Sequence, residues 1–287
     1  MPRVAYVNGR YVDHRLACVH VEDRGYQFAD GVYEVIHLFR NRLIDEDPHL
    51  DRLDRSLREL EIPWPMHRNA MKIAMREIVR RNSFGTGLLY IQATRGVAPR
   101  NHKFPDLVLP SLVMTVRAVS EFPDEMRENG VKIITIEDIR WGRCDIKSVA
   151  LLPNILGKQS AARAEAYEAW MYDSRGYITE GTSSNAWIVT GDGVLVTRPA
   201  GKDILCGITR QAILELAKEQ GIPFEERKFS RDEALEAREV FMSNSSHFVT
   251  PVTRIDDAII ANGKPGSLSS ELHARYIKFM ESFSKLV

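Results

Sequence analysis

The sequence predicts an α+β protein, because segments with the pattern of strands and segments with the pattern of helices are interleaved through its 287 residues. Near the start, large apolar residues flank Asn8-Gly9, a pair that is the strongest short signal for a β-hairpin. An apolar stripe at helical spacing follows Asp47-Pro48. A polar break at residues 120–125 then separates this half from a second one, which again mixes strands and helices.

The first half, residues 1–119, is expected to fold as a small α/β sandwich domain. Its hairpin carries large apolar residues on both arms, namely Val4, Tyr6, Tyr11 and Val12. A helix should begin near Asp47, because Pro48 suits the first turn of a helix. Four leucines then give this helix one apolar stripe: Leu50, Leu53, Leu57 and Leu60.

A second helix is predicted over about residues 69–82, and two more strands over 88–94 and 107–116. The apolar residues of this helix that we expect to face the core are Ile73, Ile78 and Val79. These elements and the hairpin complete the predicted first domain.

Residues 120–125 are expected to be an interdomain linker, and residues 126–287 a second, larger domain. Alternation of apolar residues from Val131 predicts a strand that leads toward Lys147. An alanine-rich helix, a hairpin over Asp192-Gly193, an amphipathic helix and a further strand are predicted at 154–168, 185–197, 208–219 and 239–243.

Composition excludes several classes of protein. Lysine plus arginine and aspartate plus glutamate both number 39, so no global charge would attract nucleic acid or an anionic membrane. The three cysteines are far apart and the histidines lack metal-ligand spacing, which argues against a disulfide framework and a metal site. No signal peptide or run of 18 apolar residues stands out. We therefore expect a cytoplasmic protein.

Two short segments carry the chemistry: Arg-Cys-Asp-Ile-Lys-Ser at 143–148 and Thr-Glu-Gly-Thr-Ser-Ser-Asn at 179–185. A lysine partly removed from water, as Lys147 would be, can act as an amine nucleophile toward an aldehyde. A carboxylate such as Glu180 can keep a pyridine nitrogen protonated, and a turn rich in hydroxyl and N–H groups can hold phosphate. These are the needs of a pyridoxal 5′-phosphate (PLP) site, although a solvated lysine and a turn carboxylate remain the simpler alternatives.

Both segments resemble the signatures of fold-type IV PLP enzymes, and the first resembles the D-amino-acid aminotransferases in particular. Three further strings match in the order of that family: residues 22–35, 94–102 and 207–210. The resemblance implies a barrel-like sheet in the larger domain. It also implies that Lys147 forms the Schiff base with PLP and moves the substrate proton, and that Glu180 pairs with the pyridine nitrogen.

Four residues are candidates for the cofactor phosphate. Helical periodicity places Arg52 off the leucine stripe and would make it a solvated residue, whereas the resemblance assigns its guanidinium to the phosphate. Ile208 and Thr209 follow Gly207 at a predicted helix N-terminus, where free N–H groups attract phosphate. Ser245 either adds a hydroxyl to the phosphate or is an ordinary turn serine.

Three residues are candidates for binding the substrate carboxylate. Arg100 and His102 lie two positions apart in a loop, so that both side chains can reach one carboxylate if the loop is extended. By resemblance they form a trap together with Tyr33. The alternatives are a solvated basic loop and, for Tyr33, an aromatic residue at a sheet edge.

The sequence therefore predicts a PLP-dependent transaminase that exchanges amino groups between D-amino acids such as D-alanine and 2-oxo acids such as 2-oxoglutarate, in a ping-pong cycle. By resemblance it should be a homodimer with its active site at the subunit interface. Alternatives on the same scaffold are a branched-chain L-amino-acid aminotransferase, an R-selective amine transaminase and an aminodeoxychorismate lyase. A more distant alternative is a non-catalytic PLP-binding protein.

Overall fold

The computed structural model describes residues 3–119 and 123–283, and its contacts divide the chain into two compact units. Of the described residues, the first unit holds 3–119 together with Ile146–Ala150, and the second holds the rest. Lys147 thus groups with the first unit, although it lies within the predicted larger domain. Residues 120–122 of the predicted linker lie outside the described residues, and the domain boundaries stay a prediction.

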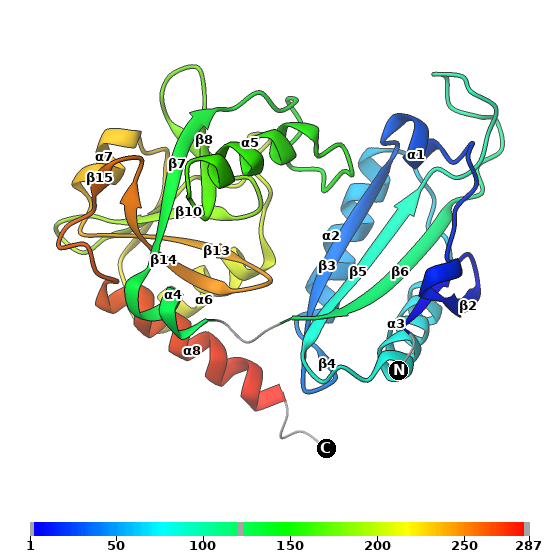
Figure 1. Ribbon diagram of the computed structural model, residues 1–287, viewed down its shortest axis with the longest axis horizontal. Helices are drawn as coiled ribbons and strands as arrows, with labels where there is room; N and C mark the ends of the chain where they lie inside the picture. Colours follow the sequence, from blue (N-terminus) through cyan, green and yellow to red (C-terminus); the bar gives the residue numbers. More distant parts are fainter. Residues whose placement is uncertain (1–2, 120–122, 284–287) are drawn as a thin grey trace. The chain divides into compact units, whose positions relative to one another are not determined.

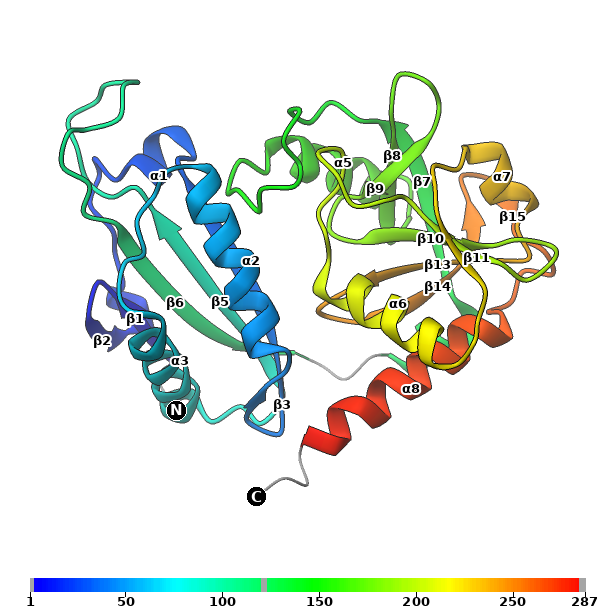
Figure 2. The same ribbon diagram turned by 180° about the vertical axis from the view of Figure 1, so that it is seen from behind.

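The first unit is a six-stranded antiparallel sheet with the order β2-β1-β6-β5-β3-β4. Its strands are β1 (Val4–Val7), β2 (Arg10–Asp13), β3 (Gly31–Phe39), β4 (Arg42–Leu43), β5 (Gly87–Thr94) and β6 (Ser111–Ala118). Its helices are η1 (His14–Leu16, a 3₁₀ turn), α1 (Arg24–Phe28), α2 (Glu46–Glu59) and α3 (Arg68–Asn82). Figures 1 and 2 show α2 and α3 on the same face of this sheet.

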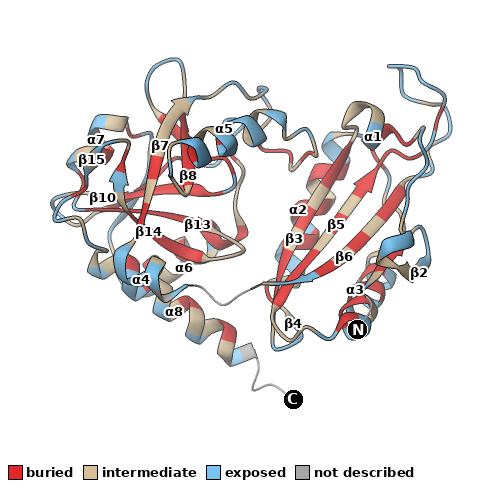
Figure 3. Cartoon of the chain, viewed as in Figure 1, coloured by how far each residue is buried: buried red, intermediate tan, exposed pale blue. Residues whose placement is uncertain are grey.

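Most sequence-based expectations for this unit are confirmed. The hairpin turns at Asn8 and Gly9, both with positive φ, and pairs Tyr6 with Tyr11. The leucine stripe of α2 is buried through Leu57, against the strand residues Val32 and Ile36. Figure 3 shows the buried residues of α2 and of the strands it covers.

Two details were wrong. Ile73 is 68% exposed, because it lies about 140° around the helix from Ile78, whose side the core contacts. Residues 107–110 are not in a strand: β6 begins only at Ser111, after Pro110, which has no N–H to give to a sheet.

The second unit contains a nine-stranded sheet with the order β12-β11-β10-β13-β14-β7-β8-β9, with β15 beside β14. Its strands are β7 (Val131–Glu137), β8 (Glu168–Tyr172), β9 (Ile178–Gly181), β10 (Asn185–Val189), β11 (Leu195–Thr197), β12 (Phe224–Glu226), β13 (Glu239–Asn244), β14 (Phe248–Ile255) and β15 (Ala258–Ile259). Its helices are α4 (Asp124–Asn129), α5 (Leu152–Arg163), α6 (Ile208–Glu219), α7 (Arg231–Glu236) and α8 (Ser267–Phe283). Figure 1 shows this sheet curled, as the predicted barrel-like sheet requires.

Two apolar clusters hold the second unit together. One joins Trp170 and Val240 of the sheet to Phe229 and Ala234, and the other packs Ile213 of α6 on the sheet. The alanine-rich helix predicted to 168 ends at Arg163, because Glu165 turns the backbone with positive φ. The N–H of Tyr167 then donates to the carbonyl of Lys132 in β7. The α+β fold class is confirmed.

Candidate active site

The backbone of Lys147 is fixed against the edge of β3. The N–H of Tyr33 donates to the carbonyl of Lys147 over 2.9 Å, and the N–H of Val149 donates to the carbonyl of Gly31 over 3.0 Å. On the other side, the N–H of Lys147 donates to the Oγ of buried Ser56 on α2 over 3.3 Å. Sheet and helix together therefore hold Lys147 in one place.

The amine of Lys147 lies over an aromatic ring. Its Nζ is 4.3 Å from the ring centroid of Tyr33, and the side chain is half-buried. The ring of Tyr90 lies 5.7 Å from that of Tyr33, and burial raises the pKa of Tyr90 to about 12. Two of the predicted site residues, Lys147 and Tyr33, are thus in direct contact.

Arg52 is buried, so the interpretation of helical periodicity that made it a solvated residue was wrong. Its Nε and Nη2 donate to the two carboxylate oxygens of Glu34, each over 2.8 Å. His49 Nδ1 lies 2.7 Å from the same carboxylate. Burial would raise the pKa of Glu34, but the charge and hydrogen bonds of Arg52 outweigh it and lower that pKa.

This ion pair fixes the direction of Arg52. Ser56, which contacts the backbone of Lys147, lies one helical turn after Arg52 on α2.

Burial lowers the pKa of His49 against the opposing effect of Glu34, so the imidazole is neutral near pH 7 and adds no second positive charge.

Arg100 and His102 lie in an exposed loop between β5 and β6. Both touch the same ring, that of Phe28: the Arg100 guanidinium carbon is 4.7 Å from its centroid, and the His102 ring is 5.3 Å away at 69°. The two side chains therefore point to one side of the loop, as their spacing predicted.

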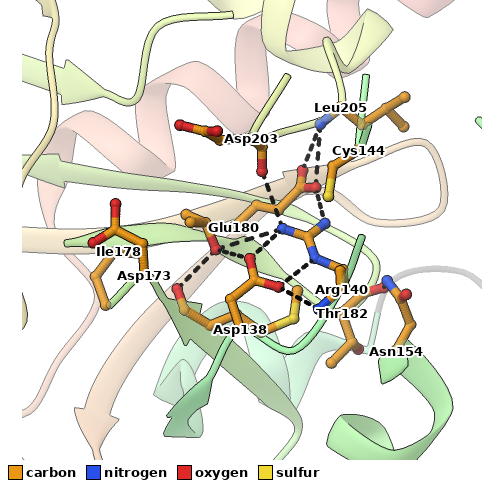
Figure 4. Close-up of polar contacts among 12 residues, drawn as sticks. Asp138, Arg140, Cys144, Asn154, Asp173, Ile178, Glu180, Thr182, Asp203 and Leu205 are labelled. Carbon is orange, nitrogen blue, oxygen red and sulfur yellow. Dashed lines mark hydrogen bonds and ion pairs between the residues drawn. The ribbon is translucent and has the colours of Figure 1, made fainter. Parts of the chain in front are cut away.

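In the second unit, Glu180 is a buried carboxylate near the end of β9. It accepts hydrogen bonds from the backbone N–H of Leu205 and from Nδ2 of Asn185, at 3.1 Å in each case, and from Nη1 of Arg140. Figure 4 shows the Arg140 guanidinium lying between Asp138 and Glu180. Glu180 is thus neither a helix cap nor an exposed turn residue.

Arg140 is itself held on several sides. Its Nε and Nη2 donate to the carboxylate of Asp138 over 2.9 and 2.7 Å, and Nη2 also donates to the carbonyl of Asp203 over 3.1 Å. Burial opposes the charge of Arg140, but Asp138 and Glu180 outweigh that effect and raise its pKa. The network places a permanent positive charge behind Glu180.

The N-terminus of α6 has the geometry of an anion site. Gly207 caps the helix without a side-chain hydrogen bond, and the first helical bond runs from Gln211 to Gly207, so the N–H groups of Ile208 and Thr209 precede it. A Cβ on Gly207 would come within 2.2 Å of Asn185 Oδ1. Asn185 also binds Glu180 and the carbonyl of Leu205, which joins the acid to this turn.

The predicted site residues therefore form three groups in the structure. Lys147, Tyr33 and Arg52 are linked through β3 and α2, while Arg100 and His102 meet at Phe28. Glu180 is linked to the 207–209 turn through Asn185 in the second unit. Ser245 lies half-buried in the turn between β13 and β14.

The sequence did not reveal the charged partners of these residues. They are Glu34 beside Arg52, Arg140 beside Glu180, and Arg24, which donates to the backbone carbonyl of His102. Glu34 left a signal, because it shares the inward face of β3 with Val32 and Ile36, and a carboxylate on a core face demands a cation. Arg140 left no comparable signal, because its contacts come from residues 39 to 63 positions away or from Asp138, two positions before it.

A family model described as amino-transferase class IV matches residues 31–255 of this sequence. The chain belongs to the class IV aminotransferases. Among the relatives of this aminotransferase, the D-alanine aminotransferase of Listeria innocua serovar 6a is 42% identical over 275 residues, which are 95% of this chain and 94% of that protein. The resemblance to the D-amino-acid aminotransferases is confirmed by this match.

Solved structures agree with the fold of this aminotransferase. The branched-chain amino acid aminotransferase of Escherichia coli is 25% identical and has a TM-score of 0.90, covering 97% of this chain and 94% of the other. The branched-chain aminotransferase of the archaeon Thermoproteus uzoniensis, solved with norvaline, has a TM-score of 0.84 at 24% identity, with the same coverage. Another branched-chain aminotransferase, solved with pyridoxamine 5′-phosphate, has a TM-score of 0.89 at 24% identity. These likenesses establish the fold-type IV architecture.

Proposed function

We propose that this class IV aminotransferase transfers amino groups between D-amino acids such as D-alanine and 2-oxo acids such as 2-oxoglutarate. The observation that carries the choice of substrate is the pair Arg100 and His102, whose side chains meet at Phe28. A guanidinium and an imidazole on one side of a loop can grip a carboxylate, which D-amino acids and 2-oxo acids share. The name of the Listeria relative supports the same choice.

PLP would be the cofactor, and the residues present fit it. Lys147 offers an amine on a fixed backbone, and Glu180 offers a buried carboxylate backed by Arg140. For the phosphate, the N–H groups of Ile208 and Thr209 are available in a turn too tight for any side chain at Gly207. Arg52 and the Ser245 hydroxyl would complete the phosphate site.

PLP, when bound, supplies an electron sink: its ring takes up the electron pair that remains on the substrate α-carbon when the α-hydrogen leaves as a proton. Lys147 would hold the cofactor covalently and then use its freed amine to carry the proton away from the substrate α-carbon. Glu180 would accept a hydrogen bond from the pyridine nitrogen and keep that nitrogen protonated. Asp138 contributes by holding Arg140, so that the guanidinium keeps Glu180 in place.

Tyr33, Arg100 and His102 would bind the substrate carboxylate and thereby decide which hydrogen of the substrate faces Lys147. The Lys147 amine lies over the aromatic ring that carries the Tyr33 hydroxyl. A substrate that reaches Lys147 would therefore also contact Tyr33. Handedness would follow from the side on which the carboxylate is held.

A direct test follows pyruvate formation from D-alanine and from L-alanine in separate reactions, with 2-oxoglutarate as acceptor. The proposal expects turnover with D-alanine and at most a trace with L-alanine. Preference for L-leucine would identify a branched-chain aminotransferase. Activity with (R)-amines alone would identify an amine transaminase, pyruvate release from aminodeoxychorismate a lyase, and PLP binding without any turnover a non-catalytic protein.

We also propose that the protein is a homodimer in the cytoplasm. Large apolar side chains are exposed along three segments of the first unit, which the Asp23–Val97 and Gly96–Leu109 bridges join: Val21, Tyr26, Val97, Leu107 and Leu109. In the part of the chain that the structure describes, none of the three cysteines is in a disulfide, which suits a reducing compartment. Among the described residues, no helix is long and apolar enough to cross a membrane. Light scattering on the purified protein would give its mass directly.

A further inference from the structure

Helix α1 is seated firmly at the end of β5. The carboxylate of Asp23 caps the helix at the N–H of Gly25 over 2.9 Å and also accepts the hydroxyl of Thr94 over 3.0 Å. Gly25 approaches Thr94 so closely that a Cβ would come within 2.2 Å of its methyl group. The first residue of the helix, Arg24, donates its N–H to the carbonyl of Gly96 over 2.9 Å. α1 is therefore a rigid platform.

Arg24 reaches from this platform into the loop that carries Arg100 and His102. Its side chain is only 4% exposed, and its Nε donates to Asp30 over 2.8 Å. The rest of the guanidinium donates to backbone carbonyls of the loop: Nη1 to Asn101 and, over 3.5 Å, to Lys103, and Nη2 to His102 over 3.4 Å. One buried cation thus contacts the backbone on both sides of the His102 side chain.

Arg24 and Phe28 lie four residues apart and hence on one side of α1. The Arg24 guanidinium carbon is 4.9 Å from the centroid of the Phe28 ring, which is the ring that Arg100 and His102 also touch. α1 therefore supports the loop twice, through carbonyl contacts from Arg24 and through the face and edge of Phe28.

A second buried arginine supports the far end of the same loop. Arg95 donates to both oxygens of Asp30 over 2.7 and 3.0 Å, and its guanidinium carbon is 3.5 Å from the ring centroid of Phe104. Asp30 is thus shared by two arginines. Because one carboxylate cannot satisfy both cations, the remaining donors of Arg24 bind the carbonyl oxygens of the loop.

We infer that Arg24 is a positioning residue for the substrate carboxylate: it fixes the backbone at 101–103 so that Arg100 and His102 present their side chains together. The inference rests on the proposed function, because that function assigns binding of the substrate carboxylate to this loop. Arg24 itself is buried beneath the loop and acts only through it.

The test uses the full-length protein with PLP and the variant Arg24→Met, which keeps most of the side-chain stem and removes every donor. We expect the KM for both D-alanine and 2-oxoglutarate to rise about 10-fold or more with a much smaller change in kcat, because a misplaced binding loop loses contacts made in ground and transition states alike. Trypsin should cut faster after Arg100 and Lys103, as mapped by mass spectrometry. Arg24→Lys should fold even if Arg24→Met does not, and should shift both readouts less in the same direction.

Asn82→Ala is the matched control, because buried Asn82 also tethers backbone groups of the first unit, at Val4 and Ile78, away from the loop. It should lower the melting temperature without changing the KM values or the cleavage at Arg100 and Lys103. Unchanged loop cleavage and KM in both Arg24 variants would overturn the inference, as would equal effects of Asn82→Ala.

Arg100→Leu distinguishes failure of the positioning role of Arg24 from failure of the proposed carboxylate trap. If Arg100→Leu raises KM and the Arg24 variants do not, the positioning role is wrong and the carboxylate trap stands. If Arg24→Met speeds cleavage of the loop but neither it nor Arg100→Leu changes KM, the loop does not bind the substrate, and the proposed trap fails together with the inference.

Discussion

The ion-pair cluster around Asp30 in the first unit and the one around Arg140 in the second combine positive and negative charges in opposite proportions. In the first unit the Asp30 carboxylate is shared between two arginines, Arg24 and Arg95. The Glu34 carboxylate, by contrast, binds one arginine, Arg52, and the neutral imidazole of His49. In the second unit one arginine is shared between two carboxylates. Arg140 binds Asp138 and Glu180, and Arg198 binds Asp173 and Asp203.

This difference matches the chemistry that each unit would perform. The Asp30 cluster, with two arginines and one carboxylate, carries an excess positive charge beneath a loop proposed to receive the substrate carboxylate. The Arg140 cluster carries an excess negative charge at Glu180, where a protonated pyridine nitrogen would be bound. A buried charge is costly without a partner of the opposite sign. The excess charge of each cluster would therefore be balanced when a ligand of the opposite charge binds.

The largest effect is expected from Lys147, the amine that the first unit holds on β3. Lys147→Ala should lower kcat by about 1,000-fold or more, because one group would serve as covalent anchor and as base. Borohydride should fix PLP to the peptide that contains Lys147 in the parent protein. Lys158→Ala, which removes a half-exposed lysine of the second unit, is the control and should retain activity. Recovery of the label on Lys158 would contradict the assignment.

The second unit is tested by removing each of the two acids around Arg140 in turn. Glu180→Gln should slow transfer of the α-proton by about 30- to 1,000-fold, which corresponds to roughly 2–4 kcal/mol for a charge-assisted contact to the cofactor. Asp138→Asn should slow it much less, because Asp138 contacts Arg140 and Thr179 around Glu180 and would not contact the cofactor itself. Single-turnover kinetics with D-alanine would measure both. Equal effects of the two variants would mean that the acids serve only the fold.

The charge surplus of the first unit is tested at its exposed end. Arg100→Leu should raise the KM for D-alanine and 2-oxoglutarate about 10-fold or more at similar kcat, because the lost contact is to a group present in ground and transition states. Amines without a carboxylate should be little affected or should improve. Lys103→Leu removes a nearby positive charge from the same loop and should leave these constants unchanged. If Arg100→Leu and Lys103→Leu had the same kinetics, Arg100 would not be a residue that binds the substrate carboxylate.

The smallest effect concerns stability in acid. The pKa of Glu34 in the folded protein lies below its ordinary value of 4.5, so the stability it contributes is complete above that pH and is lost as the pH falls below it. The free energy of unfolding should therefore fall by up to about 1.4 kcal/mol per pH unit from this group alone. Denaturant titrations between pH 5 and 3 should show a shallower dependence in Glu34→Gln. An equally steep dependence would mean that Glu34 is not ionised in the folded state.

The sequence was most informative where local pattern decides structure. The Asn8-Gly9 turn, the leucine stripe of α2 and the helix that starts at Ile208 were all predicted, because each depends on neighbours within a few positions. The helix predicted to 168 and the inward position of Ile73 were wrong, since Glu165 leaves the helix and another face of α3 meets the sheet.

The site was predicted from motifs rather than from geometry. Lys147, Glu180 and the Arg100–His102 pair stood out through their strings, but the residues that hold them did not. Arg24 contacts a loop 77 positions away, and Arg140 contacts Glu180 from 40 positions away. Such partners are chosen by the fold, so a single sequence leaves them indistinguishable from surface arginines.

Exchange of the α-hydrogen in deuterated water would show whether this aminotransferase acts on D-amino acids. D-Alanine and L-alanine would each be incubated in D₂O with the PLP-loaded protein and a little pyruvate, and the α-hydrogen signal followed by NMR. We predict that the signal of D-alanine disappears while that of L-alanine persists. Loss of the signal from L-alanine, with that of D-alanine unchanged, would show that the enzyme acts on L-amino acids and not on D-amino acids.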